Sequence, residues 1–242
     1  MKELFSNYQE CNLEEARKVV FSRRVDLKYV IPLERLEDIF HALEADYHVV
    51  EYNNMQSLPY HTLYYDSVNN ISYLDHHNKR LPRYKIRKRS YEASGDVFLE
   101  LKIKTNKNNT VKRRLPLEKF ETGISEKEAG FLREYIHEAA GNLSPAIGIW
   151  FDRITLVRKD YKERCTIDTN YRVKNSLGER NLGDVAIIEV KHEMFDHSSK
   201  MKKVLKGIRA YPQGFSKYCM GRALLDKNLK RNNFKMKLRL YN

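Results

Sequence analysis

Glycine and proline are scarce in this sequence, with 10 and 6 residues among 242. No stretch rich in proline, glycine or serine has the composition of a linker, and no internal repeat divides the chain. All-β domains of this length often stay undivided. We therefore expect a single domain over residues 1–242.

Cysteine and long apolar runs are also lacking. The three cysteines, Cys11, Cys165 and Cys219, are widely spaced and form no CxxC pattern, which is typical of a reducing compartment. The N-terminal residues MKELFSNYQE lack the apolar segment of a signal peptide, and no apolar run reaches about 18 residues. These absences predict a cytoplasmic, soluble protein without a disulfide framework or a transmembrane segment.

Basic residues are abundant by comparison. Lys and Arg number 45 against 32 Asp and Glu, a formal net charge of +13. Long-range attraction then favours a polyanionic partner, and nucleic acid, anionic membrane and polyphosphate all fit that description. No aromatic stacking platform or helix-turn-helix pattern accompanies the basic runs, so we do not expect nucleic acid. The sequence also lacks the glycine-rich phosphate loops GxxxxGK[ST] and GxGxxG.

Segments rich in β-branched and aromatic residues predict about eight or nine strands. Five polar or amphipathic segments predict helices, including one that starts at Pro32 and one capped by Ser125. This composition favours a mainly β (α+β) fold, an antiparallel barrel with helices packed outside. The expected strands are 23–31, 47–52, 59–67, 83–91, 96–104, 110–117, 147–158, 162–174 and 186–193, and the expected helices 12–20, 32–43, 126–139, 198–208 and 215–228.

Several of these strands carry charged residues two positions apart, which places them on one face of a strand. A single set of this kind is more often the solvated face of a half-buried sheet. Like charges repeated over several strands repel, however, and together they indicate an anionic ligand. Lys88 and Arg113 break the alternation, and we expect their long side chains to reach solvent. The sets are Lys85, Arg87 and Arg89; Glu100, Lys102 and Lys104; Lys112 and Arg114; Arg164, Thr166 and Asp168; and Glu189 and Lys191.

The order of short motifs along the chain resembles the VTC domain, the polyphosphate polymerase branch of the triphosphate tunnel metalloenzymes or CYTH-like superfamily. Each motif is weak alone, but the set runs from about residue 23 to residue 225. The motifs are KY (28–29), YYD (64–66), KIRKRSY (85–91), FLELKIK (98–104), VKRRLPL (111–117), FDR (151–153), RCTID (164–168), IIEVKHE (187–193) and SKY (216–218).

This resemblance implies a closed antiparallel β-tunnel of eight strands. It implies a polyphosphate polymerase that transfers the γ-phosphoryl group of ATP to a growing polyphosphate chain. On the strand 110–117, either Lys112 or Arg114 could be the phosphate-binding base. Four bases share strand faces with the phosphate-binding residues given next: Lys85, Lys104, Arg114 and Lys191. The phosphate-binding residues implied are Lys28, Arg87, Arg89, Lys102, Lys112, Arg153, Arg164, Ser216 and Lys217, of which Lys28, Arg87, Arg89, Lys102 and Lys217 are the candidates for catalysis.

The resemblance further implies a divalent ion, Mn²⁺ or Mg²⁺, held by Glu189. Glu100 is a second candidate ligand, although Glu100 and Asp168 can equally be structural partners of the bases. The wider superfamily has an E-x-E-x-K signature where this chain has Lys102 in place of the second Glu. VTC-type members share that change, which separates this chain from adenylyl cyclase and thiamine triphosphatase relatives.

Two other functions stay open at this point. The same site could serve a hydrolase, an inorganic or nucleoside triphosphatase, in which water replaces the polyphosphate end as nucleophile. The basic balance also allows a non-catalytic polyphosphate-binding module. The chain has no transmembrane or SPX-like region of the kind that eukaryotic VTC subunits have, so we do not expect it to couple synthesis to translocation by itself.

Overall fold

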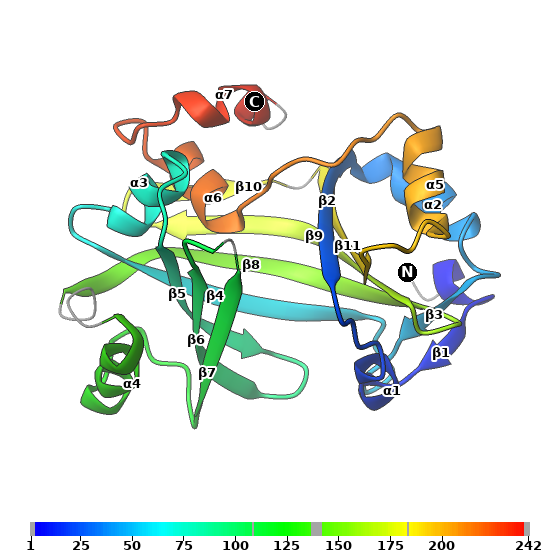
Figure 1. The fold of residues 1–242 in the computed structure, drawn as a ribbon, viewed down its shortest axis with the longest axis horizontal. Helices are drawn as coiled ribbons and strands as arrows, with labels where there is room; N and C mark the ends of the chain where they lie inside the picture. The colour runs from blue at the N-terminus through cyan, green and yellow to red at the C-terminus, as the bar shows by residue number, and fades with distance from the viewer. Residues whose placement is uncertain (1–2, 108, 137–141, 183, 240–242) are drawn as a thin grey trace. The chain divides into compact units, whose positions relative to one another are not determined.

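The computed structural model describes residues 3–107, 109–136, 142–182 and 184–239. Strands dominate these residues (Figure 1). The strands are β1 (Gln9–Cys11), β2 (Arg24–Pro32), β3 (Tyr47–Val50), β4 (Ser57–Ser67), β5 (Arg83–Tyr91), β6 (Asp96–Lys104), β7 (Thr110–Leu117), β8 (Leu143–Arg158), β9 (Glu163–Asn175), β10 (Gly178–Asn181) and β11 (Val185–Glu193). The α-helices are α1 (Leu13–Arg17), α2 (Leu36–His41), α3 (Ile71–His77), α4 (Glu126–Ile136), α5 (Lys200–Gly207), α6 (Lys217–Leu225) and α7 (Lys235–Leu238).

The strands form one hydrogen-bonded sheet of 11 strands. Its main path has the order β2-β11-β9-β8-β4-β5-β6-β7, with β1, β3 and β10 joined beside it. The prediction of a mainly antiparallel β fold with helices packed outside is confirmed. The closed eight-stranded tunnel is not confirmed, because the described sheet has 11 strands and its path ends at β2 and β7 without a pairing between them.

The chain divides into two compact units. The first unit comprises Met1–Pro59, Phe151–Tyr171 and Leu182–Phe215, and the second comprises Tyr60–Trp150, Arg172–Asn181 and Ser216–Asn242. Strands β4, β8 and β9 have residues in both units. The single domain that we expected over residues 1–242 stays a prediction.

The core of the first unit lies between one face of β2, β9 and β11 and the helices α2 and α5. Alternate residues of the strands supply it, such as Tyr29 of β2, Ile167 of β9 and Ile188 of β11. Because side chains alternate along a strand, the intervening residues Lys28 and Glu189 face the other side of the sheet.

The second unit is built in the same way around β5, β6, β7 and α4. Ile86 and Leu101 pack with Leu132 and Ile136 of α4 in its core. The face of the sheet away from this core carries the basic residues at alternate positions of β5, β6 and β7, as the sequence predicted.

Several element boundaries differ from those expected. Pro32 ends β2 instead of opening a helix, and a 3-10 turn over Leu33–Arg35 precedes α2. The first helix covers only Leu13–Arg17, with Asn12 as its N-cap. Ser125 accepts a hydrogen bond from the backbone N–H of Glu128 at 3.3 Å, as a capping residue should. Residues 137–139 of the expected fourth helix lie outside the described residues.

No helix in the described part of the chain has the length and apolar character needed to span a bilayer. The three cysteines are buried and free of disulfides.

Lys88 does not reach solvent, contrary to the prediction. Its side chain is 1% exposed and pairs with Glu128 of α4 at 2.7 Å. Its ammonium group also donates hydrogen bonds to the carbonyl oxygens of Glu121 and Gly123, at 3.0 and 2.5 Å. Burial is tolerated because all three donors of the ammonium have acceptors. Arg113, the other residue that breaks the alternation, is exposed as predicted.

Lys88→Ala should therefore unfold far more easily than the wild type. It leaves the Glu128 carboxylate buried without its partner, which costs about 3–5 kcal/mol. Urea unfolding measures the loss. Lys127→Ala, which removes an exposed lysine beside Glu128, should change the free energy of unfolding by less than about 0.5 kcal/mol. Equal stability of the two variants would show that the Lys88–Glu128 pair does not hold α4 on the sheet.

Candidate functional site

Three lysines lie in register across three neighbouring strands of the second unit. Lys85 of β5 is opposite Lys102 of β6, which is opposite Lys112 of β7. Like charges directly opposite each other in a sheet destabilise it. A sheet that keeps this arrangement is suited to an anion that neutralises the row.

The adjacent row combines bases with one carboxylate. Arg87 of β5 and Arg114 of β7 flank Glu100 of β6. Glu100, only 1% exposed, contacts the Arg87 guanidinium at 2.6 Å, Arg114 Nε at 2.9 Å and Lys112 Nζ at 2.6 Å. One acid thus anchors three bases, and positive charge remains in excess on this face.

These contacts change the ionisation of both partners. Burial alone would raise the pKa of Glu100, but the nearby Arg87, Arg89 and Lys112 hold it well below its usual range. Burial lowers the pKa of Lys112 to about 8, in spite of the opposing effect of Glu100. Glu100 is therefore ionised at neutral pH, and Lys112 gains or loses its charge in the mildly alkaline range.

Strand β4 supplies polar groups that orient the arginines of β5. Arg87 donates a hydrogen bond to the Tyr64 hydroxyl at 2.9 Å, and Arg89 donates one to Thr62 at 3.2 Å. Neither Tyr64, which belongs to the YYD motif, nor Thr62 is among the site residues that the sequence predicts. Only strand pairing brings β4 next to β5, so no local pattern could reveal these contacts.

The start of α6 meets this face through Ser216. Lys85 Nζ donates a hydrogen bond to Ser216 Oγ at 2.9 Å, and Ser216 caps α6. Helix α6 is held by Tyr218, whose hydroxyl donates to Asp66. Asp66 also accepts from the backbone N–H groups of Ser72 and Tyr73, at 2.9 and 3.0 Å. The candidates Lys85 and Ser216 are therefore in contact, and Lys217 follows as the first residue of α6.

A second cluster lies in the first unit, on β2 and β11. Glu189 Oε1 contacts Lys28 Nζ at 2.6 Å and Glu189 Oε2 contacts Lys191 Nζ at 2.8 Å. Burial would raise the pKa of Glu189, but Lys191 and Lys28 hold it well below its usual range. The carboxylate is ionised at neutral pH and is shared by two ammonium groups.

The neighbouring strands β8 and β9 add Arg153 and Arg164 to this unit's candidates. The Arg153 guanidinium donates hydrogen bonds to both carboxylate oxygens of Asp168, at 2.6 and 2.8 Å. Asp168 is thus a partner of a base, the alternative considered from the sequence. Arg164 is opposite Lys191 in the sheet, and Thr166 is opposite Glu189. The Thr166 hydroxyl oxygen is buried and has no hydrogen-bond partner among the described residues.

The described residues do not form a cage of protein ligands for a metal ion. Nowhere in the described ranges do three His, Cys, Asp or Glu residues come together as a metal site. Glu100 fits poorly as a ligand, because three bases surround it and it is almost fully buried. Glu189 is more accessible, at 19% exposure, and its two partners are flexible lysines. It fits an ion that takes most of its oxygen ligands from phosphate and water, as Mg²⁺ commonly does.

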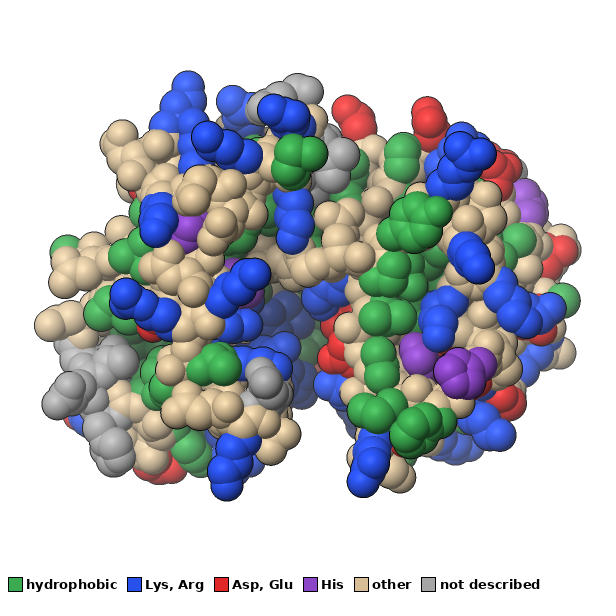
Figure 2. Space-filling model, turned by 45° about the horizontal axis from the view of Figure 1, so that its top comes forward, with side chains coloured by type: hydrophobic (Ala, Val, Ile, Leu, Met, Phe, Trp, Pro, Cys, Tyr) green, Lys and Arg blue, Asp and Glu red, His purple; other side chains and the backbone are tan. Residues whose placement is uncertain are grey.

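Basic side chains are common elsewhere on the surface as well. Figure 2 shows Lys and Arg over much of the visible face, in line with the net charge of +13. What distinguishes the two clusters is the strand register, which fixes several bases on one face of each unit.

Residues 23–226 match the family model of the VTC domain. The chain belongs to the VTC domain family. No curated protein matches the sequence. The resemblance inferred from the motifs is therefore confirmed, with bounds close to the predicted 23–225.

Several solved structures are similar to this VTC domain. One is a Hippeastrum protein described as a candidate adenylyl cyclase with a dominant triphosphatase activity. It has a TM-score of 0.53 and 14% identity, and the match covers 83% of this chain and 95% of that chain. A candidate adenylate cyclase from Bacillus halodurans has a TM-score of 0.49 and 11% identity, over 80% of this chain and 94% of that chain. The S. pombe RNA triphosphatase Pct1 has a TM-score of 0.32 and 10% identity, over 94% of this chain and 90% of that chain.

The titration of Lys112 gives a testable pH dependence. A lysine whose pKa is about 8 loses its charge as the pH rises through that value, so an anion bound to it is held less well. From about pH 7.5 to 9.5, we expect the Kd for ATP to rise about tenfold or more, because each pH unit above the pKa lowers the charged fraction of the lysine by a factor of about ten.

Lys112→Arg is the matched control for this pH profile. A guanidinium stays charged over the whole range, so its profile should be nearly flat. Calorimetric titration at several pH values measures both. The same rise of Kd in wild type and Lys112→Arg would exclude Lys112 as the titrating group.

Proposed function

We propose that this VTC domain is a metal-dependent phosphotransferase that binds ATP and polyphosphate and transfers the γ-phosphoryl group of ATP to the end of a polyphosphate chain. The observation that carries the proposal is the row of Lys85, Lys102 and Lys112 in register across β5, β6 and β7. A chain of phosphates is a ligand whose repeated charges match a repeated row of bases.

Neutralisation of the ligand is the first task of the bases. A triphosphate carries roughly four negative charges near neutral pH, and charge-assisted hydrogen bonds from several Lys and Arg would compensate them. Arg87 and Arg89 are already oriented by Tyr64 and Thr62, so little side-chain entropy would be lost when they bind phosphate. The proposed phosphate contacts of the first unit are Lys28, Arg153, Arg164 and Lys191. The proposed contacts that complete the set in the second unit are Lys104, Arg114, Ser216 and Lys217.

Phosphoryl transfer depends more on positioning and charge stabilisation than on covalent help from the protein. We propose catalytic roles for Lys28 in the first unit and for Arg87, Arg89, Lys102 and Lys217 in the second. Glu189 is the proposed ligand of a divalent ion, Mn²⁺ or Mg²⁺. When bound, that ion would neutralise charge that develops on the transferred group. Phosphate would draw Lys28 and Lys191 away from Glu189 and free its oxygens.

Family membership supports this function, because the VTC domain matches most of the chain. A triphosphatase is the second candidate, favoured by the triphosphatase activity described for the Hippeastrum neighbour. Water would then replace the polyphosphate end as the nucleophile. A cytoplasmic location and a closed tunnel stay predictions.

The direct test is incubation of the full chain with ATP and Mn²⁺. A polymerase gives long polyphosphate on a gel together with ADP. A triphosphatase gives free phosphate without polyphosphate, and a binding module gives neither product. Polyphosphate would support the proposal, and either of the other results would contradict it.

Glu189→Gln separates metal binding from phosphate binding. It keeps the size of the side chain but removes the charge that would hold a divalent ion. Turnover should fall about a thousandfold, the worth of several kcal/mol of transition-state stabilisation. Tripolyphosphate affinity without metal should persist or rise, because the charges of Lys28 and Lys191 are then uncompensated.

Glu37→Gln is the matched control, since it makes the same change at an exposed helix position of the first unit. It should leave turnover and affinity unchanged. Wild-type turnover in Glu189→Gln would show that Glu189 holds no catalytic metal.

A further inference from the structure

Three large apolar side chains are exposed at one end of the first unit. Val20 is 81% exposed, Phe195 71% and Met194 46%. We call these three residues the apolar tip. Exposed apolar groups that gather at one place commonly mark a site of interaction.

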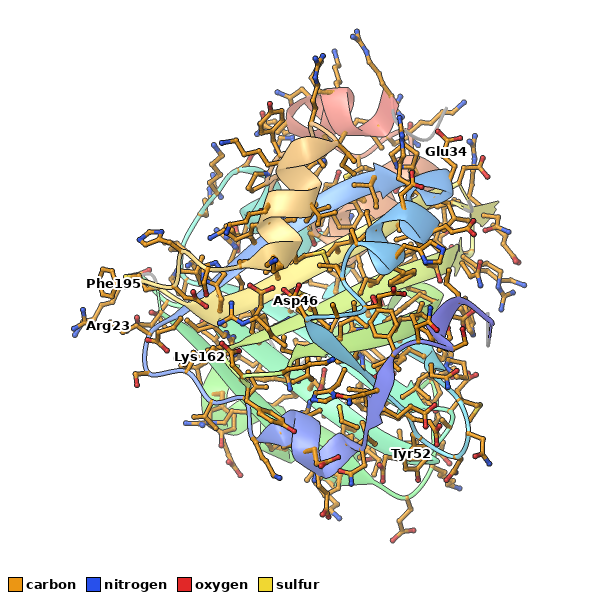
Figure 3. All side chains as sticks on the ribbon, turned by 90° about the vertical axis from the view of Figure 1, so that its right-hand side faces the viewer. Arg23, Glu34, Asp46, Tyr52, Lys162 and Phe195 are labelled. Carbon is orange, nitrogen blue, oxygen red and sulfur yellow. The ribbon has the colours of Figure 1, made fainter. Side chains whose placement is uncertain are left out.

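The tip belongs to two segments that the strand pairing holds together. Arg24 at the start of β2 is opposite Glu193 at the end of β11. Beyond this pair, the Glu193 carboxylate accepts hydrogen bonds from the backbone N–H groups of Ser22 and Arg23, at 3.0 and 2.7 Å. The N–H of Met194 donates to the carbonyl of Arg23 at 2.8 Å. Figure 3 shows Phe195 and Arg23 projecting outward at the same edge.

The outward direction of Val20 is fixed by its neighbours. Val19 is buried in a small core with Cys11 and Val157, and Phe21 packs against the same core. With both flanking residues turned inward, Val20 points to solvent. The apolar tip is thus part of an ordered surface, which spares it the entropy cost of ordering on binding.

Four exposed basic residues lie in the segments beside the tip. Lys18, Arg23, Lys159 and Lys162 are exposed, and Figure 3 shows Lys162 near the same edge as Arg23. Lys18 lies 5.9 Å from the centre of the Tyr161 ring, which links α1 to the β8–β9 turn. Several acids of this end have partners: Asp160 and Asp196 both pair with the buried Arg158 at 2.7 Å, and Glu193 accepts the backbone N–H groups of Ser22 and Arg23. The four exposed bases are the groups that an anionic partner would contact.

We propose that this end of the first unit docks on an anionic lipid bilayer. Val20, Met194 and Phe195 would enter the boundary between headgroups and acyl chains, and Lys18, Arg23, Lys159 and Lys162 would meet the anionic headgroups. A weak apolar anchor combined with a basic patch gives reversible, salt-dependent binding of a peripheral protein. This proposal is independent of the phosphotransferase activity proposed above.

The test is co-sedimentation of the full chain with vesicles of phosphatidylcholine, with and without about one third phosphatidylglycerol. The wild type should bind the anionic vesicles at least tenfold more tightly, and high salt should weaken binding. The triple variant V20S/M194S/F195S keeps every charge and should lose about tenfold in affinity. R23Q/K162Q should bind less tightly at low salt and show a smaller dependence on salt.

Controls separate the tip from general effects. Leu177→Ser and Met236→Ser remove exposed apolar side chains of the second unit and should bind like the wild type. Thermal melting should show that the triple variant is folded. Wild-type vesicle binding by a folded triple variant would overturn the proposal, because charge alone would then explain it. Absence of vesicle binding by the wild type would also overturn it. If the wild type failed to bind vesicles but formed dimers that the triple variant did not form, the tip would be a contact between two copies of the chain.

Discussion

Repulsion among aligned basic side chains is the constraint on which the second unit's candidate site depends. Lys85, Lys102 and Lys112 lie opposite one another, and in the next row Glu100 lies between Arg87 and Arg114. Glu100 is almost fully buried and meets three bases, so it neutralises part of the charge and fixes their positions. The positive charge of this face is the proposed driving force for binding an anion, and the opposite face of the same strands packs against α4.

The two clusters balance their charges differently. In the first unit, Glu189 is paired with Lys28 and Lys191, while Arg153 is paired with Asp168. Each carboxylate there has its own basic partners, and an anion must compete with them. In the second unit a single carboxylate serves three bases. We therefore expect the β5–β7 face to supply more of the affinity for phosphate. Glu189, whose side chain is more exposed than that of Glu100, is expected to take part in the reaction.

The strands of the second unit and the faces of their charged residues were largely predictable from local sequence patterns. β-branched and aromatic residues predicted the bounds of β5, β6 and β7 to the residue, and the period of two placed Lys85, Lys102 and Lys112 each on the charged face of its own strand. Contacts between distant segments were not predictable in the same way. Lys88 was wrongly expected in solvent, because its partner Glu128 comes from a helix forty residues later. Strands β1 and β10 are too short for a periodic signal, and the closure of a sheet depends on pairings that no local pattern contains.

The central claim is that the aligned bases of β5–β7 bind a chain of phosphates, and calorimetric titration of tripolyphosphate without metal tests it most directly. Lys102→Ala should raise the Kd by about ten- to a hundredfold, the loss of one charge-assisted hydrogen bond worth about 1.5–3 kcal/mol. Its stability to urea should not fall, because a repulsion within the row is removed. Arg113→Ala, which removes an exposed charge from the opposite face of β7, should leave the Kd nearly unchanged. An unchanged Kd in Lys102→Ala, or an equal loss in both variants, would contradict the account.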